Sequence, residues 1–243
     1  MDFSVNPKLR IKVHGMRKML TWTLLPAHCL LCEQAGMGDI DLCEACWREL
    51  PNNPLACLRC ALPMAAPAPA CGFCIKSEPA FTTTVAPMQY QIPISSLVPR
   101  LKFHQDLAAG RLLAELFCRK TSGVDRPDVL VPVPLHAKRL RQRGFDQALE
   151  LAKMIAKQKD LPMRSDLLIR ARNTAAQSYL DASQRRHNLK NAFVATPQTM
   201  PGHVALIDDV MTTGATVHEC AKVLLQAGVK RVDIWVMARV APP

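Results

Sequence analysis

The sequence predicts an α/β fold, a parallel sheet with flanking helices, preceded by a small cysteine-rich zinc-binding module. Eight of the ten cysteines form CxxC pairs between Cys29 and Cys74, a pattern typical of structural zinc sites. After about residue 80, short apolar runs alternate with segments of helical periodicity. The 243 residues suffice for one such domain and a small module. We therefore expect a flexible N-terminal extension (1–18), a double zinc-ribbon module (19–80) and an α/β domain (81–243).

The N-terminal extension carries five basic residues before an apolar stretch, like the front of a secretory signal. It lacks a small-residue cleavage site, so we interpret it as a mobile extension, or as sequence upstream of a natural start at Met19. The apolar stretch, Met19–Leu31, contains Pro26 and His28 and is shorter than the roughly 18 to 20 residues of a membrane helix. We expect a cytoplasmic protein without membrane insertion.

The cysteine pairs begin every fourteen residues, and the pattern CxxC, ten residues, CxxC occurs twice. Each half can close one tetrahedral site, and four thiolates leave no open position for water, so both Zn²⁺ ions are expected to be structural. Joining the first pair to the second and the third to the fourth is simplest, although the spacing also allows an interleaved arrangement. The expected ligands are Cys29, Cys32, Cys43, Cys46, Cys57, Cys60, Cys71 and Cys74.

Two other uses of the cysteine pairs are disfavoured. A disulfide framework would need an export signal, which is missing, and a thioredoxin-like redox motif uses one CxxC on a βαβ unit. The module has few large apolar residues, so we expect it to collapse on chelation. The remaining cysteines, Cys118 and Cys220, lie in helical patterns and are expected to be core thiols.

The α/β domain is predicted from alternating periodicities. Helices are expected over Leu97–Phe117, Phe145–Lys157 and Val217–Leu225, the last stopped by Gly228. Strands are expected over Val129–Val133, Leu167–Ile169, Phe193–Ala195, Val204–Ile207 and Val232–Val236. In a parallel sheet of this kind the ligand lies at the carboxyl ends of the strands.

The most informative stretch is Val204–Thr216, with the sequence VALIDDVMTTGAT. A buried strand leads to two carboxylates, Asp208 and Asp209, and then to a hydroxyl-rich turn that opens a helix. The backbone N–H groups and threonine hydroxyls of the turn suit a phosphate, and Gly214 lets the backbone approach it closely. The carboxylates repel phosphate, but they accept hydrogen bonds from hydroxyls or hold a metal ion. A ribose 5-phosphate satisfies both halves.

This stretch resembles the signature of the type I phosphoribosyltransferases, a hydrophobic strand, an acidic pair and a TTGxT loop. The resemblance implies that Asp208 and Asp209 hold the ribose 2- and 3-hydroxyls, which is the catalytic role, and that the loop holds the 5-phosphate. The expected substrate-binding residues of this stretch are Val210, Met211, Thr212, Thr213, Gly214, Ala215 and Thr216.

Two further segments carry candidate substrate-binding residues. The strand at Val129–Val133 is followed by a basic loop that can receive pyrophosphate, although a solvated basic loop is the alternative. Its basic residues are Lys138, Arg139, Arg141 and Arg143. The segment Arg170–Phe193 has few apolar anchors and resembles the mobile loop that closes over the active site in this fold and excludes water. Its candidates are Arg172, Gln177, Arg185 and Arg186.

Together with the cysteine repeat, LKFH at Leu101–His104 and RGFDQ at Arg143–Gln147, the chain resembles the ComF family, including its GntX-like members, over about residues 19–239. The resemblance implies a role in DNA uptake during natural competence. The family usually has RGFNQ. Asp146 stands in place of the asparagine, and its charge is expected to weaken pyrophosphate binding.

The sequence thus predicts a phosphoribosyltransferase that binds phosphoribosyl pyrophosphate with Mg²⁺ and transfers ribosyl phosphate to a nitrogen acceptor without a covalent enzyme nucleophile. The acceptor is expected to meet the zinc module or the Met88–Leu97 region. The formal net charge of +11 agrees with an anionic ligand, and two Zn²⁺ ions on eight thiolates lower it to about +7.

Two alternatives remain open at this point. One is a non-catalytic competence factor that binds single-stranded DNA, or competence-machinery proteins, and uses the fold as a scaffold. The other is a regulator that binds phosphoribosyl pyrophosphate without turnover. The small number of aromatic residues and the acidic pair inside a basic cleft argue against DNA binding there.

Overall fold

The computed structural model describes residues 27–66, 68–172, 189 and 191–241. The chain divides into two compact units, Met1–Glu49 and Leu50–Pro243. This division separates the two halves of the cysteine repeat, because the first four cysteines lie in the first unit and the next four in the second. Within the described residues, no helix has the length and apolar character needed to cross a membrane.

The described part of the first unit is a small knuckle. Isolated β-bridges join His28 to Ala35 and Met37 to Ile40. The short helix α2 (Glu44–Arg48) follows, and Cys43 caps its start because the Cys43 Sγ accepts a hydrogen bond from the backbone N–H of Cys46 at 3.5 Å. The knuckle thus brings its cysteines together through tight turns.

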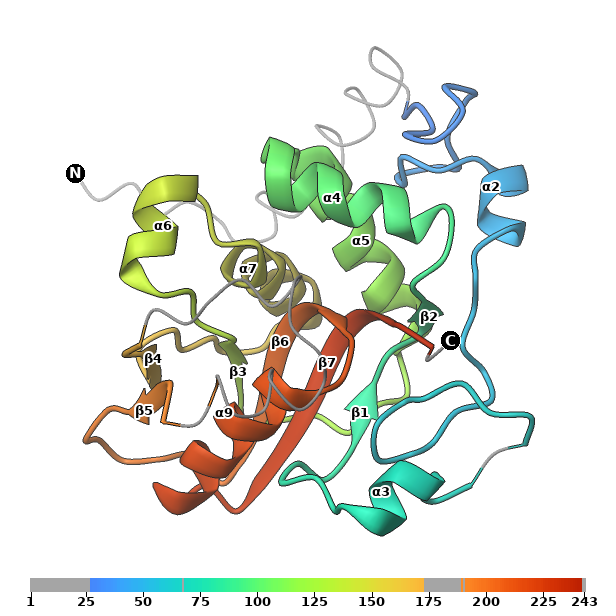
Figure 1. Cartoon of the computed structure of the whole chain (residues 1–243). Coiled ribbons are helices and arrows are strands. Elements are labelled where there is room, and N and C mark those ends of the chain that lie inside the picture. The colour runs from blue at the N-terminus through green and yellow to red at the C-terminus, as the bar shows by residue number, and fades with distance from the viewer. Residues whose placement is uncertain (1–26, 67, 173–188, 190, 242–243) are drawn as a thin grey trace, which may run out of the picture. The chain divides into compact units, whose positions relative to one another are not determined.

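The second unit contains a parallel sheet (Figure 1). Its strand order is β1-β7-β6-β3, β2 also pairs with β7, and every pair is parallel. All residues of β6 and β7 are buried or partly buried, as expected for central strands of a sheet that is covered on both faces. The strands are β1 (Thr84–Val85), β2 (Met88–Gln89), β3 (Val129–Pro132), β6 (His203–Met211) and β7 (Arg231–Arg239).

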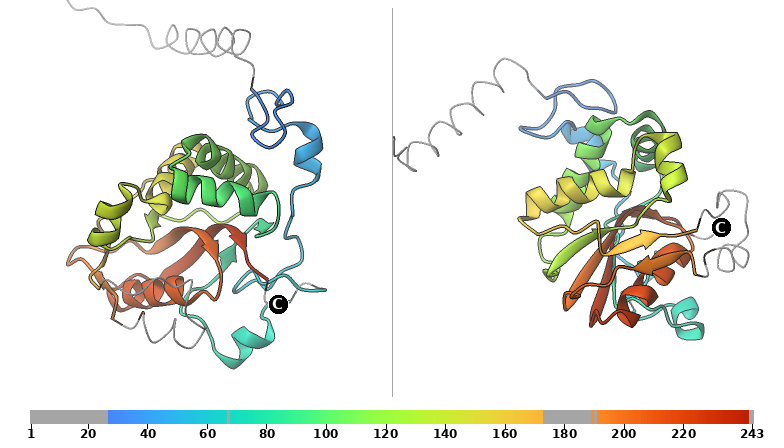
Figure 2. Two further views of the ribbon diagram at one scale, coloured as in Figure 1. Left: turned by 45° about the horizontal axis from the view of Figure 1, so that its top comes forward. Right: turned by 90° about the vertical axis from the view of Figure 1, so that its left-hand side faces the viewer.

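Helices cover both faces of this sheet (Figure 2). Helices α5 (Leu107–Lys120) and α7 (Gln147–Lys159) lie on one face, where the ring of Phe117 is 5.4 Å from that of Trp235 in β7. Helix α4 (Ile94–His104) packs on α5, and α9 (Ala215–Gln226) covers the opposite face. The predicted parallel sheet with flanking helices is therefore confirmed.

The second cysteine knuckle is built into this α/β unit. Its cysteines share one hydrophobic core with residues of α9 and the sheet, among them Val217 and Ile234. The Thr84 hydroxyl in β1 donates a hydrogen bond to the Arg59 carbonyl at 2.7 Å, and the His218 Nδ1 in α9 accepts one from the N–H of Ala80 at 3.1 Å. The knuckle includes helix α3 (Gly72–Lys76).

The segment predicted as one helix over Leu97–Phe117 is in fact two helices, α4 and α5. The break lies at Gln105, whose φ of 54° is left-handed and ends α4. Asp106 then caps α5, because its carboxylate accepts hydrogen bonds from the N–H groups of Ala108 and Ala109, each at 3.0 Å. Apolar periodicity continued across the break, so the pattern did not show it.

Two predicted strands do not belong to the parallel sheet. They form β4 (Leu168–Arg170) and β5 (Phe193–Ala195), an antiparallel pair of their own. Their middle residues, Ile169 and Val194, are 52% exposed, so this pair is covered on one face only. The strands β1 and β2 were not predicted, because two residues carry no readable periodicity.

Candidate functional site

The predicted phosphate loop, Thr212–Thr216, comprises the turn between β6 and α9 and the first two residues of α9. Gly214 is the N-cap of α9 and has a left-handed φ of 78°, and a Cβ there would lie 2.5 Å from the Met211 Cε. The Thr213 hydroxyl accepts a hydrogen bond from the N–H of Ala215 at 3.4 Å. The first N–H groups of a helix have no partner within the helix, so the start of α9 favours an anion.

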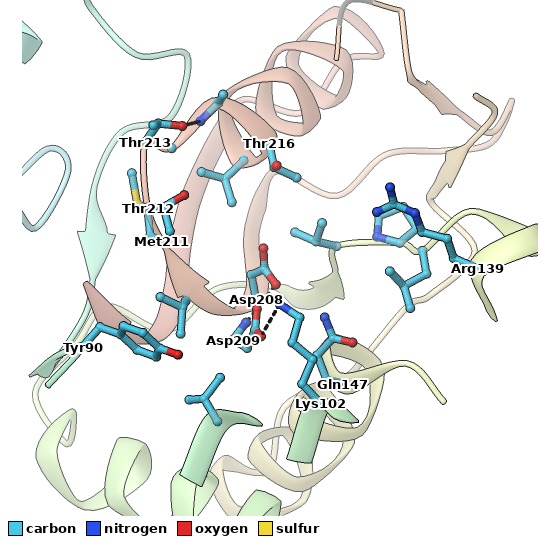
Figure 3. Close-up of a pocket in the computed structure, with 18 of the residues that line it drawn as sticks. Tyr90, Lys102, Arg139, Gln147, Asp208, Asp209, Met211, Thr212, Thr213 and Thr216 are labelled. Atoms are coloured by element: carbon cyan, nitrogen blue, oxygen red, sulfur yellow. Dashed lines mark hydrogen bonds and ion pairs between the residues drawn. The ribbon is translucent and has the colours of Figure 1, made fainter. Parts of the chain in front are cut away.

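Asp208 and Asp209 lie near the carboxyl end of β6, and two residues separate Asp209 from this loop (Figure 3). The Asp209 side chain is 5% exposed, and its Oδ2 lies 3.1 Å from the Nζ of Lys102 in α4. Burial alone would lower the pKa of Lys102. The charges of the two carboxylates outweigh this effect, so the pKa is raised above its ordinary value. Burial and the neighbouring charge of Asp209 hold the pKa of Asp208 well above its ordinary value.

Arginines gather beside the carboxylates. The segment predicted as a basic loop is helix α6 (Ala137–Arg143), which starts where the His136 Nδ1 accepts a hydrogen bond from the N–H of Lys138 at 3.2 Å. Helix α6 supplies Arg139 and Arg143, and Arg170 comes from β4. Burial, and then the charge of Arg143, lower the pKa of Arg139, while burial and the charge of Arg139 lower that of Arg170. Such mutual repulsion favours binding of an anion.

The other side of the site is apolar. Tyr90, Val98, Pro99 and Phe103 line it, and Figure 3 shows Tyr90 and Arg139 on opposite sides of the carboxylates. Val98 is buried, whereas Phe103 is 63% exposed. The Arg143 guanidinium lies 5.6 Å from the centre of the Phe103 ring, so a cation and an aromatic face meet at the edge of the site.

Gln147, the first residue of α7, has a buried amide beside Lys102. It is 5% exposed, and its Oε1 has no hydrogen-bond partner among the residues that the structure describes. A buried polar atom without a partner carries a cost, which a ligand hydroxyl or a bound water removes. Gln147 therefore marks a polar position inside the site.

These groups line one pocket of about 450 Å³. The residues predicted from the sequence that the structure brings together there are Asp208, Asp209, Val210, Met211, Thr212, Thr213, Gly214, Ala215, Thr216, Arg139 and Arg143. Lys138 and Arg172 are described but do not line the pocket. The candidates Gln177, Arg185 and Arg186 lie outside the described residues.

Asp146 has a role that the sequence comparison with the family pattern did not suggest. It is the N-cap of α7, and its Oδ1 accepts hydrogen bonds from the N–H groups of Ala148 and Leu149 at 3.0 and 3.2 Å. Its Oδ2 accepts a third from the N–H of Leu135 at 3.4 Å. Asp146 does not line the pocket. Its carboxylate is therefore directed to the backbone that positions α7.

The eight paired cysteines form two tetrads, one in each unit. In both tetrads all four sulfur atoms lie within 4.8 Å of one another. The Sγ atoms of Cys32 and Cys43 are 3.5 Å apart, and those of Cys60 and Cys71 are 3.6 Å apart. Zn–S bonds of about 2.3 Å place tetrahedral ligands about 3.8 Å apart, so the residues fit Zn²⁺. The structure thus selects the simpler pairing, first with second and third with fourth.

The two remaining cysteines join neither tetrad. Cys220 is fully buried in α9. Cys118 is partly buried, and burial raises the pKa of its thiol to about 11. Both therefore stay protonated at neutral pH.

The chain is similar to known proteins over most of its length. The double zinc ribbon domain family matches residues 20–75. DNA utilization protein YhgH of Salmonella typhimurium is 36% identical over 222 residues, 88% of this chain and 98% of the relative. Competence protein F of Haemophilus influenzae is 34% identical over 221 residues, 87% of this chain and 96% of the relative. The chain belongs to the family of these proteins, the ComF family.

The ComF-family assignment confirms the resemblance drawn from the motifs. Competence protein ComFC of Streptococcus pneumoniae is a more distant relative, 28% identical over 62% of this chain and 65% of that protein. Among solved structures, UMP synthase of Leishmania donovani is 22% identical, with a TM-score of 0.36 over 57% of this chain and 24% of that one. That superposition is too loose to bear on the site.

Sequence reasoning missed four polar residues of the site in this ComF-family protein: Tyr90, Lys102, Gln147 and Arg170. Lys102 and Gln147 lie inside the LKFH and RGFDQ motifs, which were noted for the family resemblance and given no role. Arg170 begins the segment in which Arg172 was chosen instead. Alternation along β4 was the available signal, because Leu168 and Arg170 are buried and Ile169 is exposed. Tyr90 lies in the Met88–Leu97 region named for the acceptor.

Proposed function

We propose that this protein binds phosphoribosyl pyrophosphate with Mg²⁺ and transfers its ribosyl 5-phosphate to a nitrogen acceptor. One observation carries the proposal: two adjacent carboxylates lie between a phosphate loop and a group of arginines in one pocket. A ligand that suits this order has a phosphate, then a diol, then a second anionic group. Phosphoribosyl pyrophosphate has its groups in that order.

Each part of the pocket takes one part of the ligand. The 5-phosphate would accept hydrogen bonds from the phosphate loop at the start of α9. The ribose hydroxyls would donate to Asp208 and Asp209, and the Lys102 ammonium holds Asp209 in place for this. The pyrophosphate would lie against Arg139, Arg143 and Arg170.

Mg²⁺ would be held by oxygens of Asp208 or Asp209 together with oxygens of the pyrophosphate. The residues fit the ion, since Mg²⁺ is commonly bound through one or two carboxylates and substrate phosphates. When bound, it would supply positive charge that neutralises the departing pyrophosphate.

The reaction is a substitution at the anomeric carbon. The bond from this carbon to the pyrophosphate oxygen breaks, and its electron pair leaves on pyrophosphate, which the arginines stabilise. The lone pair of the acceptor nitrogen forms the new bond, and the proton of that nitrogen passes to solvent. A planar acceptor base would lie on the apolar side of the pocket, against Tyr90, Val98 and Phe103. No enzyme nucleophile takes part.

We infer that this chemistry serves DNA utilization in the cytoplasm. Relatives that match most of the chain are named for DNA utilization and for competence. A reducing compartment also suits eight cysteines arranged as zinc ligands.

Isothermal calorimetry of the zinc-loaded protein with phosphoribosyl pyrophosphate and Mg²⁺ tests the proposal. The wild type should bind with micromolar affinity, and Asp208→Asn/Asp209→Asn should bind at least about a hundredfold more weakly, since hydrogen bonds to charged groups contribute about 1.5 to 3 kcal/mol each. The matched control, Asp125→Asn/Asp166→Asn, removes two exposed carboxylates outside the pocket and should bind like the wild type.

The same proteins separate the proposal from the DNA-binding alternative. If neither wild type nor variant binds phosphoribosyl pyrophosphate, while both bind a single-stranded oligonucleotide, the protein uses the fold as a scaffold. Binding without nucleotide formation for any base tested would identify the regulator that does not turn the ligand over.

A further inference from the structure

Arg239, the last residue of β7, joins the second zinc knuckle (Cys57, Cys60, Cys71 and Cys74) to the phosphate loop. It is only 7% exposed. Its Nε donates a hydrogen bond to the Cys60 carbonyl at 2.9 Å. Its Nη1 donates to the Met211 carbonyl at 3.0 Å and also to the carbonyls of Thr212 and Val240. One guanidinium therefore contacts a zinc-ligand residue and the start of the loop.

The contacts with Met211 and Thr212 determine how the loop faces the pocket. A trans peptide unit is planar, and its C=O and N–H point in opposite directions. The Met211 carbonyl shares its peptide plane with the N–H of Thr212, and the Thr212 carbonyl shares its plane with the N–H of Thr213. Because Arg239 holds both carbonyls, the two N–H groups point away from Arg239. They lie on residues that line the pocket.

The knuckle also supplies the charge that a buried guanidinium needs. Burial disfavours a charged guanidinium, so Arg239, which is buried, needs negative charge nearby. Four thiolates on one Zn²⁺ would carry two net negative charges, close to a cation whose hydrogen bonds to described residues all go to neutral carbonyls.

We propose that Arg239 is the positioning residue through which the second zinc site holds the phosphate loop in its anion-binding shape. Loss of zinc from this knuckle then weakens anion binding at the loop, although no zinc ligand lines the pocket. The inference rests on the proposed function for the identity of the anion, but the zinc-to-loop coupling can be measured without any ligand.

The test compares three variants of the zinc-loaded full chain by hydrogen–deuterium exchange, using peptides that cover the phosphate loop and β3. In Arg239→Met, exchange at the loop should rise about tenfold with β3 unchanged, because about 1.4 kcal/mol of local protection is lost. Release of one of the two zinc ions to a chelating dye should also accelerate about tenfold. Arg239→Lys should restore zinc retention but not loop protection, since an ammonium cannot reproduce the fork of the guanidinium.

The matched control is Arg231→Met, which removes an arginine from the other end of β7. Arg231 pairs with Asp125 and Asp233. The control should leave both the loop exchange and the zinc release as in the wild type. Equal acceleration at the loop and at β3 in Arg239→Met would overturn the inference, because it would indicate unfolding of the whole unit.

The dependence of loop exchange on zinc is tested in the Cys32→Ser/Cys46→Ser background, where only the second knuckle retains a full ligand set. Chelation should raise loop exchange when Arg239 is present and add little in Arg239→Met. Loop exchange that responds neither to zinc nor to Arg239 refutes the coupling. If the exchange results hold but phosphoribosyl pyrophosphate does not bind the wild type, the proposed function fails and the coupling stands.

Discussion

Replacing Lys102 by methionine should destabilise the second unit by about 3 kcal/mol. The Lys102 Nζ lies 3.1 Å from the Asp209 Oδ2, and at an effective dielectric constant of about 20 this separation corresponds to about 5 kcal/mol of attraction. Part of this is offset by desolvation of the ammonium, whose side chain is 31% exposed. Removing one partner of a buried pair typically costs about 3 to 5 kcal/mol, because the other charge stays buried alone.

Urea unfolding followed by the fluorescence of Trp235 measures this cost. Trp235 is 2% exposed in β7, and Trp22 and Trp47 are replaced by phenylalanine in all samples. With a slope of about 2 to 3 kcal/mol per molar urea, the midpoint of Lys102→Met should fall by about 1 to 1.5 M. Restoring neutrality with Asp209→Asn in the Lys102→Met background should recover part of the loss.

The matched control is Lys153→Met, which removes a lysine 2.7 Å from Glu150. This pair is closer than that of Lys102, but the lysine is 51% exposed, so its loss should cost less than about 0.5 kcal/mol. The difference in unfolding free energy between the two variants is then due to burial of the ion pair and not to its distance. A Lys102→Met midpoint no lower than that of Lys153→Met would show that Asp209 is not held as a buried anion.

Three further results are expected. Gly214→Ala should cost about 1 to 2 kcal/mol in urea unfolding and weaken phosphoribosyl pyrophosphate binding in calorimetry, because its φ is 78° and a Cβ would approach the Met211 Cε to 2.5 Å. Asp146→Asn should keep binding within about threefold, since an asparagine oxygen also caps α7, and a large gain in affinity would show that the charge does act on the ligand. Asp106→Ala should cost about 1 kcal/mol at pH 7. The backbone N–H of Ala109 and the Arg100 guanidinium lower the pKa of Asp106 despite its partial burial, so its stabilising effect is present above pH 3.8 and is lost as the pH falls through the folded-state pKa. Urea midpoints at pH 7 and pH 3 should therefore differ less for the variant than for the wild type.

Much of the fold could be predicted from local patterns. The strands β3, β6 and β7 and the helices α7 and α9 appear where apolar periodicity placed them, because a buried face repeats along a strand or helix. The errors fall where periodicity carries no information. Apolar periodicity continued across Gln105, whose left-handed φ separates α4 from α5. Periodicity also could not distinguish β4 and β5, a separate antiparallel pair, from strands of the main sheet.

Local sequence patterns were enough to predict those parts of the protein whose residues are neighbours in the chain. Each CxxC turn aims two sulfurs at one ion, and the run from Asp208 to Thr216 places carboxylates beside a phosphate loop within one strand and one turn. Such geometry follows from backbone rules over a few residues, so spacing reveals it.

The residues that complete these sites from distant parts of the chain could be identified only in three dimensions. Lys102 meets Asp209 across 107 residues, and Arg239 meets Cys60 across 179. The tertiary structure also divided the cysteine repeat, building its second half into the core beneath α9. These contacts depend on how strands and helices pack, and packing leaves no period in the sequence because it joins segments whose separation along the chain is arbitrary.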